Sequence, residues 1–101
     1  MIRIEIIANQ SVQEEIIKNL EAVVPDFCYS LIPFVYGRGK DSYKLGTTTW
    51  PETNFILLAY CADSAEQDIQ TVIEYEKKKF PDEGIKIFVL HDHESEQKNN
   101  S

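Results

Sequence analysis

The spacing of the hydrophobic residues changes from that of a strand to that of a helix and back, and this order occurs twice along the chain. The repeat limits the folds that the sequence can adopt. Ile2, Ile4 and Ile6 alternate with charged residues, which is typical of a strand with one buried face. Apolar residues then recur at helical spacing before a second strand, and the second half of the chain repeats this order. The expected strands are Ile2–Ala8, Phe27–Tyr36, Phe55–Cys61 and Ile85–Leu90, and the expected helices are 11–24 and 64–80.

Start and stop signals flank the two helical segments. Ser11 with Glu14 and Ser64 with Gln67 have the spacing of capping boxes, in which the two side chains satisfy the free N–H groups of the first turn. Pro25 is expected to stop the first helix. Each helix is therefore expected to begin at its serine.

A strand-helix-strand unit that occurs twice predicts an α+β chain with the ferredoxin-like βαββαβ fold. In this fold a four-stranded antiparallel sheet carries both helices on one face. Residues 1–91 would form the domain, and the polar residues 92–101 are expected to be a disordered tail. Pro33 lacks a backbone donor, so its part of the second strand is expected at a sheet edge or a bulge.

The segment 37–53 joins the second and third strands and has no expected secondary structure of its own. Its first half contains Arg38, Lys40 and Lys44, whereas the whole chain has a net charge of -7. Loops of this length are uncommon in compact domains and are usually functional or disordered. We therefore expect this loop, at the tip of a hairpin, to carry the function.

Both alternating sets of residues are apolar in the second and third strands. One set is Phe27, Tyr29, Leu31, Phe55, Leu57 and Ala59, and the other is Cys28, Ile32, Phe34, Ile56, Leu58 and Tyr60. Two helices cover only one face of the sheet. The other face would expose more apolar surface than the few hundred Å² usual for soluble monomers. We therefore expect a homo-oligomer in which the sheets of different copies pack together.

Charge, cysteine content and hydropathy exclude several classes of protein. A chain of 101 residues with a net charge of -7 lacks the cation clusters that sequence-independent nucleic-acid binding needs. Cys28 and Cys61 are too few for a disulfide framework or a zinc site. No apolar stretch approaches the ~20 residues that span a bilayer, and no secretory signal is visible. We expect a cytoplasmic protein without direct membrane insertion.

A short glycine-containing motif links the expected fold to a family. The motif Gly37-Arg38-Gly39-Lys40 leaves the second strand and opens the long loop. In this setting the chain resembles the PII and PII-like signalling proteins, over residues 1–91 in layout. The resemblance implies a homotrimer whose hairpin loop, the T-loop, contacts a membrane transporter, a metabolic enzyme or another regulator. It also implies that a small anionic ligand, often an adenine nucleotide, binds between subunits near the base of that loop.

The resemblance also gives roles to residues at the two ends of the loop. Gly37 and Gly39 would allow the backbone to approach a ligand closely, and Arg38 or Lys40 would face its negative charge. The alternative for these two cations is a solvated basic loop.

Trp50 and Glu52 end the loop and complete the expected ligand-binding set. Trp50 would stack on a ligand or a partner. Its alternative role is to pack the base of the loop against a neighbouring subunit, since an aromatic side chain contributes most of its energy by area burial.

Two departures separate the chain from PII proper. PII has a second glycine-rich phosphate loop before its last strand, whereas residues 80–84 of this chain are a short acidic Phe-Pro-Asp-Glu-Gly segment. The basic C-terminal segment of PII is replaced by a polar tail. We therefore expect a PII-like protein rather than a true PII, and a ligand other than ATP.

Catalysis has little support in the sequence. There is no P-loop and no pairing of a nucleophile with a base at informative spacing. Acylphosphatases share the ferredoxin-like fold but need an arginine after the first strand, where this chain has Asn9-Gln10-Ser11. We therefore expect a protein that is not an enzyme.

Two other functions remain open at this point. His91 and His93 would point to the same side of a strand end, and with Cys61 or Glu94 they could hold a divalent metal. That arrangement would suit a metal-binding trimer related to metal-tolerance proteins. The second alternative is a structural oligomer without a ligand, in which the loop only packs against a neighbour.

Overall fold

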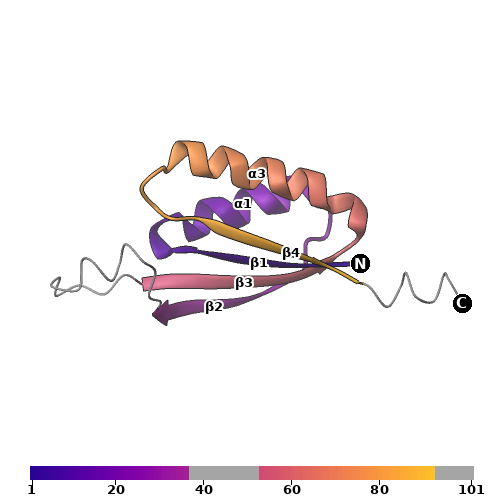
Figure 1. Ribbon diagram of the computed structural model, residues 1–101, viewed down its shortest axis with the longest axis horizontal. Helices are drawn as coiled ribbons and strands as arrows, with labels where there is room; N and C mark the ends of the chain where they lie inside the picture. The colour runs from indigo at the N-terminus through magenta and orange to yellow at the C-terminus, as the bar shows by residue number, and fades with distance from the viewer. Residues whose placement is uncertain (37–52, 93–101) are drawn as a thin grey trace, which may run out of the picture.

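The computed structural model describes residues 1–36 and 53–92, which form a sheet with two helices on one face (Figure 1). The sheet order is β2-β3-β1-β4, and all neighbouring strands are antiparallel. The ferredoxin-like fold expected from the sequence is confirmed. Its elements are β1 (Ile2–Asn9), η1 (Gln10–Val12), α1 (Gln13–Val23), β2 (Tyr29–Tyr36), β3 (Thr53–Cys61), η2 (Asp63–Ala65), α3 (Glu66–Lys79) and β4 (Lys86–His91).

The core lies between the two central strands and the helices. Ile4 of β1 pairs with Ala59 of β3, and Ile6 pairs with Leu57, so these side chains share the face that the helices cover. Each is almost completely buried. Full burial of one isoleucine or leucine side chain contributes about 1.5–3 kcal/mol. The helices close this layer with Ile16, Leu20, Ile69, Val72 and Ile73.

Strand β2 lies at one edge of the sheet and is interrupted at its proline. The register with β3 shifts between Ile32 and Val35, as a bulge at Pro33 requires. The Gln10 side chain donates a hydrogen bond to the Pro33 carbonyl at 2.6 Å and ties this bulge to η1. The prediction of an edge or bulge at Pro33 is confirmed. The strand itself begins at Tyr29 rather than Phe27, after a turn in which Asp26 has a positive φ of 52°.

Both predicted capping boxes are wrong, because a 3-10 turn precedes each helix and contains the expected capping serine. Ser11 lies inside η1, and its backbone N–H donates to the side chain of Asn9 at 2.9 Å. Ser64 lies inside η2. The residues before α1 and α3 make no side-chain capping bond. Gln67 contacts Thr71 farther along α3 instead of reaching back.

Two predictions fall on residues outside the described ranges. These are the conformation of the loop, of which residues 37–52 lie outside, and the disorder of the tail, of which residues 93–101 lie outside.

The position of Leu57 at the centre of the core yields a stability test. We expect Leu57→Ala to lower the free energy of unfolding by about 2–5 kcal/mol, because it leaves a cavity between β3 and the helices. Urea unfolding monitored by circular dichroism measures the change. Val23→Ala, at an exposed position on α1, is the control and should change stability by no more than about 0.5 kcal/mol. Equal losses in the two variants would contradict this core.

Candidate functional site

The base of the long loop is set by the last pairs of β2 and β3. Val35 pairs with Asn54 and Tyr36 pairs with Thr53, so the two ends of the stretch 37–52 leave adjacent strands at one end of the sheet. Figure 1 shows this end opposite the N-terminus of the chain. The expected hairpin between the second and third strands is therefore confirmed.

The sequence-predicted ligand residues all lie outside the described residues. They are Gly37, Arg38, Gly39, Lys40, Trp50 and Glu52. The structure fixes only where the chain enters and leaves this stretch. The roles of these six residues remain predictions.

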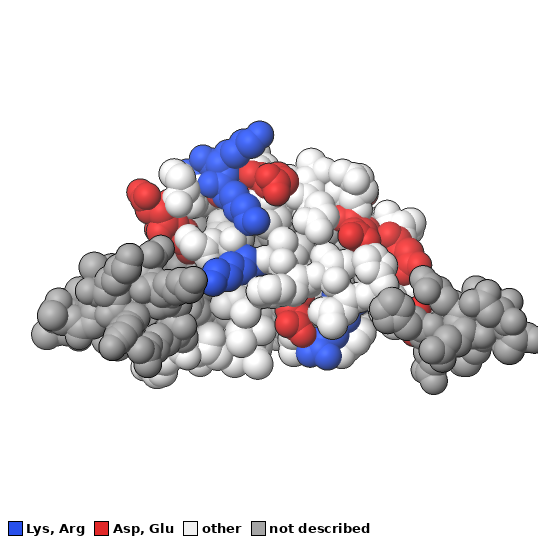
Figure 2. Space-filling model, viewed as in Figure 1, with Lys and Arg blue, Asp and Glu red and all other residues white. Residues whose placement is uncertain are grey.

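The C-terminal end of α3 lies at the same end of the molecule as the loop base (Figure 1). Lys77, Lys78 and Lys79 occupy its last turn, and Figure 2 shows Lys and Arg side chains gathered over this end of the helix. Cations here stabilise the free carbonyls of the last helical turn, and Lys79 also pairs with Glu15 at 2.9 Å. The lysines therefore have a sufficient structural role without a ligand.

The face of the sheet opposite the helices, which we call the open face, carries apolar side chains in three of its rows. Ile32 is 43% exposed, Phe88 48%, Leu90 49% and Tyr60 60%. The sequence prediction of a second apolar face is confirmed. The register places residues of the open face in cross-strand rows, which are Ile32-Ile56-Ile7-Lys86, Ser30-Leu58-Glu5-Phe88 and Tyr60-Arg3-Leu90.

The charged residues of β1 on the open face neutralise one another. Arg3 and Glu5 form an ion pair at 2.9 Å along the strand. Each lies in a row between apolar residues, Arg3 between Tyr60 and Leu90 and Glu5 between Leu58 and Phe88. The open face thus offers an apolar surface with one internal ion pair and with Lys86 at the end of its first row, which suits contact with another protein surface.

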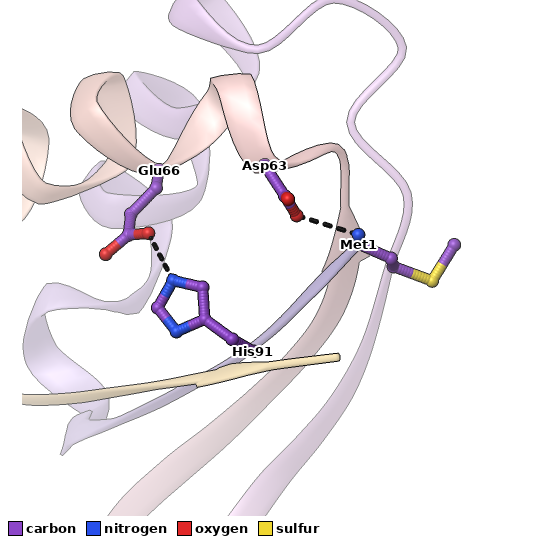
Figure 3. A network of polar contacts seen from close by, with 4 residues as sticks. All are labelled: Met1, Asp63, Glu66 and His91. Carbon is purple, nitrogen blue, oxygen red and sulfur yellow. Dashed lines mark hydrogen bonds and ion pairs between the residues drawn. The ribbon is translucent and has the colours of Figure 1, made fainter. Parts of the chain in front are cut away.

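His91 ends β4 at the opposite end of the molecule from the loop base. Its Nε2 lies 2.9 Å from Glu66 Oε1 at the start of α3, and the Met1 amino group lies 2.7 Å from Asp63 (Figure 3). No sequence signal marks Glu66 as a partner, because 25 residues separate it from His91.

The contact between His91 and Glu66 gives little support to the metal site that the sequence suggests. Ile2 pairs with His91 on one side and Cys61 on the other, so it stands between the two candidate ligands. Burial raises the pKa of the Cys61 thiol and disfavours the thiolate that a metal requires. Within residues 1–36 and 53–92 no group of three His, Cys, Asp or Glu side chains is placed to hold a metal. His93 lies outside the described residues, so its role is untested.

No helix within the described ranges has the length and apolar character needed to cross a membrane.

Comparison with known proteins connects this geometry to a fold family. No family model and no curated protein matches the sequence. Among solved structures, a PII-like signalling protein from Thermus thermophilus matches with a TM-score of 0.63 and 16% identity, over 88% of this chain and 83% of that one. CPII from Thiomonas intermedia K12, bound to ADP and bicarbonate, matches with a TM-score of 0.67 and 14% identity, over 88% and 82% of the two chains.

This chain has the PII-like fold. The fold predicted from the order of elements, and the PII-like layout that the resemblance implied, are therefore confirmed. The stretch 37–52 joins β2 and β3 of this fold. On this PII-like fold the chain carries the open face and the basic end of α3 described above.

Proposed function

We propose that the chain is a PII-like regulatory protein that acts as a homotrimer in the cytoplasm, and not as an enzyme. The observation that carries the proposal is the exposed apolar open face on a PII-like fold. Phe88 and Leu90 lie there with half their surface in water, although the same strands already form a complete core on the other face. Removing this surface from water would contribute roughly 25 cal/mol per Å².

A closed ring of three copies fits the distribution of surfaces on this chain. The helices cover one face of the sheet, so the open face can turn inward while the helices stay outside (Figure 1). Rotation about a central axis would then place three loop bases at the same end of the assembly. Such a trimer would present three copies of residues 37–53 to a partner protein, such as a membrane transporter or a metabolic enzyme.

The ion pair between Arg3 and Glu5 gives the open face a polar feature that an apolar surface alone would lack. The two residues lie on one strand, so the pair exists before any second copy arrives. Burying a complete pair costs much less than burying one charge without its partner. Its position between apolar residues on two successive rows would favour one alignment of copies over a sliding contact.

The ligand we propose is a small anion near Arg38, Lys40 and Trp50, at the base of the loop. The solved CPII structures contain ADP, AMP, bicarbonate or acetate, and each of these molecules is negatively charged. A guanidinium beside flexible glycines is well suited to phosphate or carboxylate. Gly37, Gly39 and Glu52 complete the proposed set.

The turn after α3 argues against a triphosphate in this chain. The Glu83 N–H donates to the Phe80 carbonyl at 3.1 Å, and Gly84 has a positive φ of 57°. This turn carries Asp82 and Glu83, whose charges would repel a polyphosphate. A ligand with fewer negative charges than ATP therefore fits better.

The proposed trimer gives a direct test by mass. We expect the protein to elute as three chains at micromolar concentration in size-exclusion chromatography with light scattering. Ile32→Glu should dissociate it, because Ile32 pairs with Ile56 on the open face and the interface would then bury an unpaired charge. Far-UV circular dichroism should show that the variant remains folded.

Val23→Glu is the control, because it places the same charge at an exposed position on α1, in the helix layer. It should leave the mass unchanged. A native protein that stays a single chain across this concentration range would overturn the proposed assembly.

The proposed ligand site is tested by isothermal titration with ADP, AMP and bicarbonate. We expect at least one of them to bind, and Arg38→Ala to weaken it about 10-fold or more. A hydrogen bond to a charged group contributes about 1.5–3 kcal/mol, and about 1.4 kcal/mol is a factor of ten in affinity.

Lys44→Ala removes a charge from the same loop outside the glycine motif, and it should bind nearly as well as the native chain. If none of the three anions binds, the ligand proposal fails. If zinc or copper alone raises the melting temperature, and His91→Ala removes the effect, the metal-binding alternative replaces it.

A further inference from the structure

A polar cluster lies in the seam between α1 and α3, on the side of the molecule away from the open face. Glu15 and Asn19 are one helical turn apart on α1, and Glu76 and Lys79 are one turn apart on α3. Among residues 1–36 and 53–92, Glu76 is the one charged residue that is completely buried. A glutamate is almost never fully buried unless it is paired. The seam therefore requires a specific explanation.

The two carboxyl groups of the seam have fewer hydrogen-bond donors than oxygens. The Asn19 side chain donates to Glu76 Oε1 at 2.6 Å, and Lys79 Nζ donates to Glu15 Oε1 at 2.9 Å. The second oxygen of each group, Oε2, is buried and reached by no N–H or O–H donor of the described residues. Glu15 and Asn19 are one turn apart on α1, and Glu76 and Lys79 are one turn apart on α3, so these two bonds bring the carboxyl groups of Glu15 and Glu76 together across the seam.

Two ionised carboxylates cannot satisfy this arrangement, because each would only accept hydrogen bonds. They would also repel each other in a site where water does not reach the facing oxygens. One proton between the two groups removes both problems. It gives one oxygen a hydrogen to donate and leaves a single negative charge, which Lys79 already neutralises.

We propose that Glu15 and Glu76 share one proton, and that this proton acts as a pH-sensitive latch between α1 and α3. The proton resides mainly on Glu76, which donates to Glu15. When the latch opens, the O–H bond of Glu76 breaks, its hydrogen bond to Glu15 is lost, and the released proton goes to solvent. The argument for this device does not rest on the function proposed above.

The groups around the pair decide which carboxyl holds the proton. Lys79 contacts Glu15 directly, and the charge of Lys18 on α1 also favours an ionised Glu15. Glu76 has the amide of Asn19 and is buried against the core. The groove above the pair is lined by Ser11, Glu14, Glu15, Lys18, Asn19, Tyr75 and Lys79.

The expected pKa changes agree with this assignment. Burial, together with the neighbouring Glu15 carboxyl, raises the pKa of Glu76. The hydrogen bonds from Lys79 and Glu76 lower the pKa of Glu15. Such a pair titrates as a unit, so the two changes describe one shared proton rather than two independent sites.

The difference between the folded and unfolded pKa of each glutamate fixes the direction in which stability changes with pH. Above the ordinary glutamate pKa of 4.5, the unfolded chain has lost the proton that folded Glu76 still holds, so stability falls as pH rises through the folded pKa of Glu76. Glu15 has the opposite sign, and its contribution is lost as pH falls below 4.5 through its lowered folded pKa. The latch therefore stabilises the chain most near pH 4.5 and weakens on the alkaline side.

Thermal unfolding of the full chain from about pH 4 to pH 9 tests the latch through Glu76→Gln. The glutamine amide replaces the O–H as donor but has no proton to release. As pH rises, we expect the melting temperature of the native chain to fall by roughly 4–8 °C relative to that of this variant. A shift of this size corresponds to the loss of one hydrogen bond in a domain of this length. Glu74→Gln removes the same charge from an exposed position on α3 and should keep the native slope.

Carbon-13 NMR of the glutamate side chains reads the proton directly. One carboxyl in the native protein should titrate above the ordinary glutamate range, and its signal should be absent from Glu76→Gln. In Glu15→Gln an amide donor replaces the neighbouring charge, so the Glu76 carboxyl should titrate at lower pH. The proposal is overturned if every glutamate titrates normally, or if Glu76→Gln has the same pH slope as Glu74→Gln.

Discussion

The packing of β1 against β3 at the centre of the sheet is the constraint on which the rest of the structure depends. The pairs Ile4-Ala59 and Ile6-Leu57 place large and small apolar side chains in adjacent rows beneath the helices. The same register sends the alternate residues, including Ile7 and Leu58, to the open face. Because the period of a strand is two, a slip of one residue would exchange the two faces. The core and the open face are thus fixed together, and neither can be changed without the other.

The sequence predicts the elements of this fold well because their signals repeat over many residues. Pro33 also predicts its bulge, since a missing backbone donor acts locally wherever the strand lies. The start of α1 is harder to predict, because Asn9 and Ser11 are both good capping residues two positions apart. The 3-10 turn that decides between them is held by the long-range bond from Gln10 to Pro33. Arg38 and Trp50 are identified by residue type and resemblance only, so sequence cannot establish their geometry.

The buried Glu76 shows how much of a polar cluster can be predicted from a sequence. It lies seven residues after Ile69 and three after Ile73, in phase with the buried face of α3, so the helical period alone marks it as a charge in a core position. Its partners on α1 carry no comparable signal, because Asn19 is 57 residues away. Only the packing of the two helices brings the second carboxyl close enough to require a proton.

The segment from η1 into α1 links the base of the long loop to the seam between the helices. Gln10 holds the bulge of β2 at Pro33, close to where that strand enters the loop. Glu15 lies farther along the same segment and forms half of the seam with α3. Coupling between distant sites needs an element that contacts both and has two arrangements. The stretch from Gln10 to Glu15 meets the first condition, and under our proposal the loss of the shared proton gives the seam its two states.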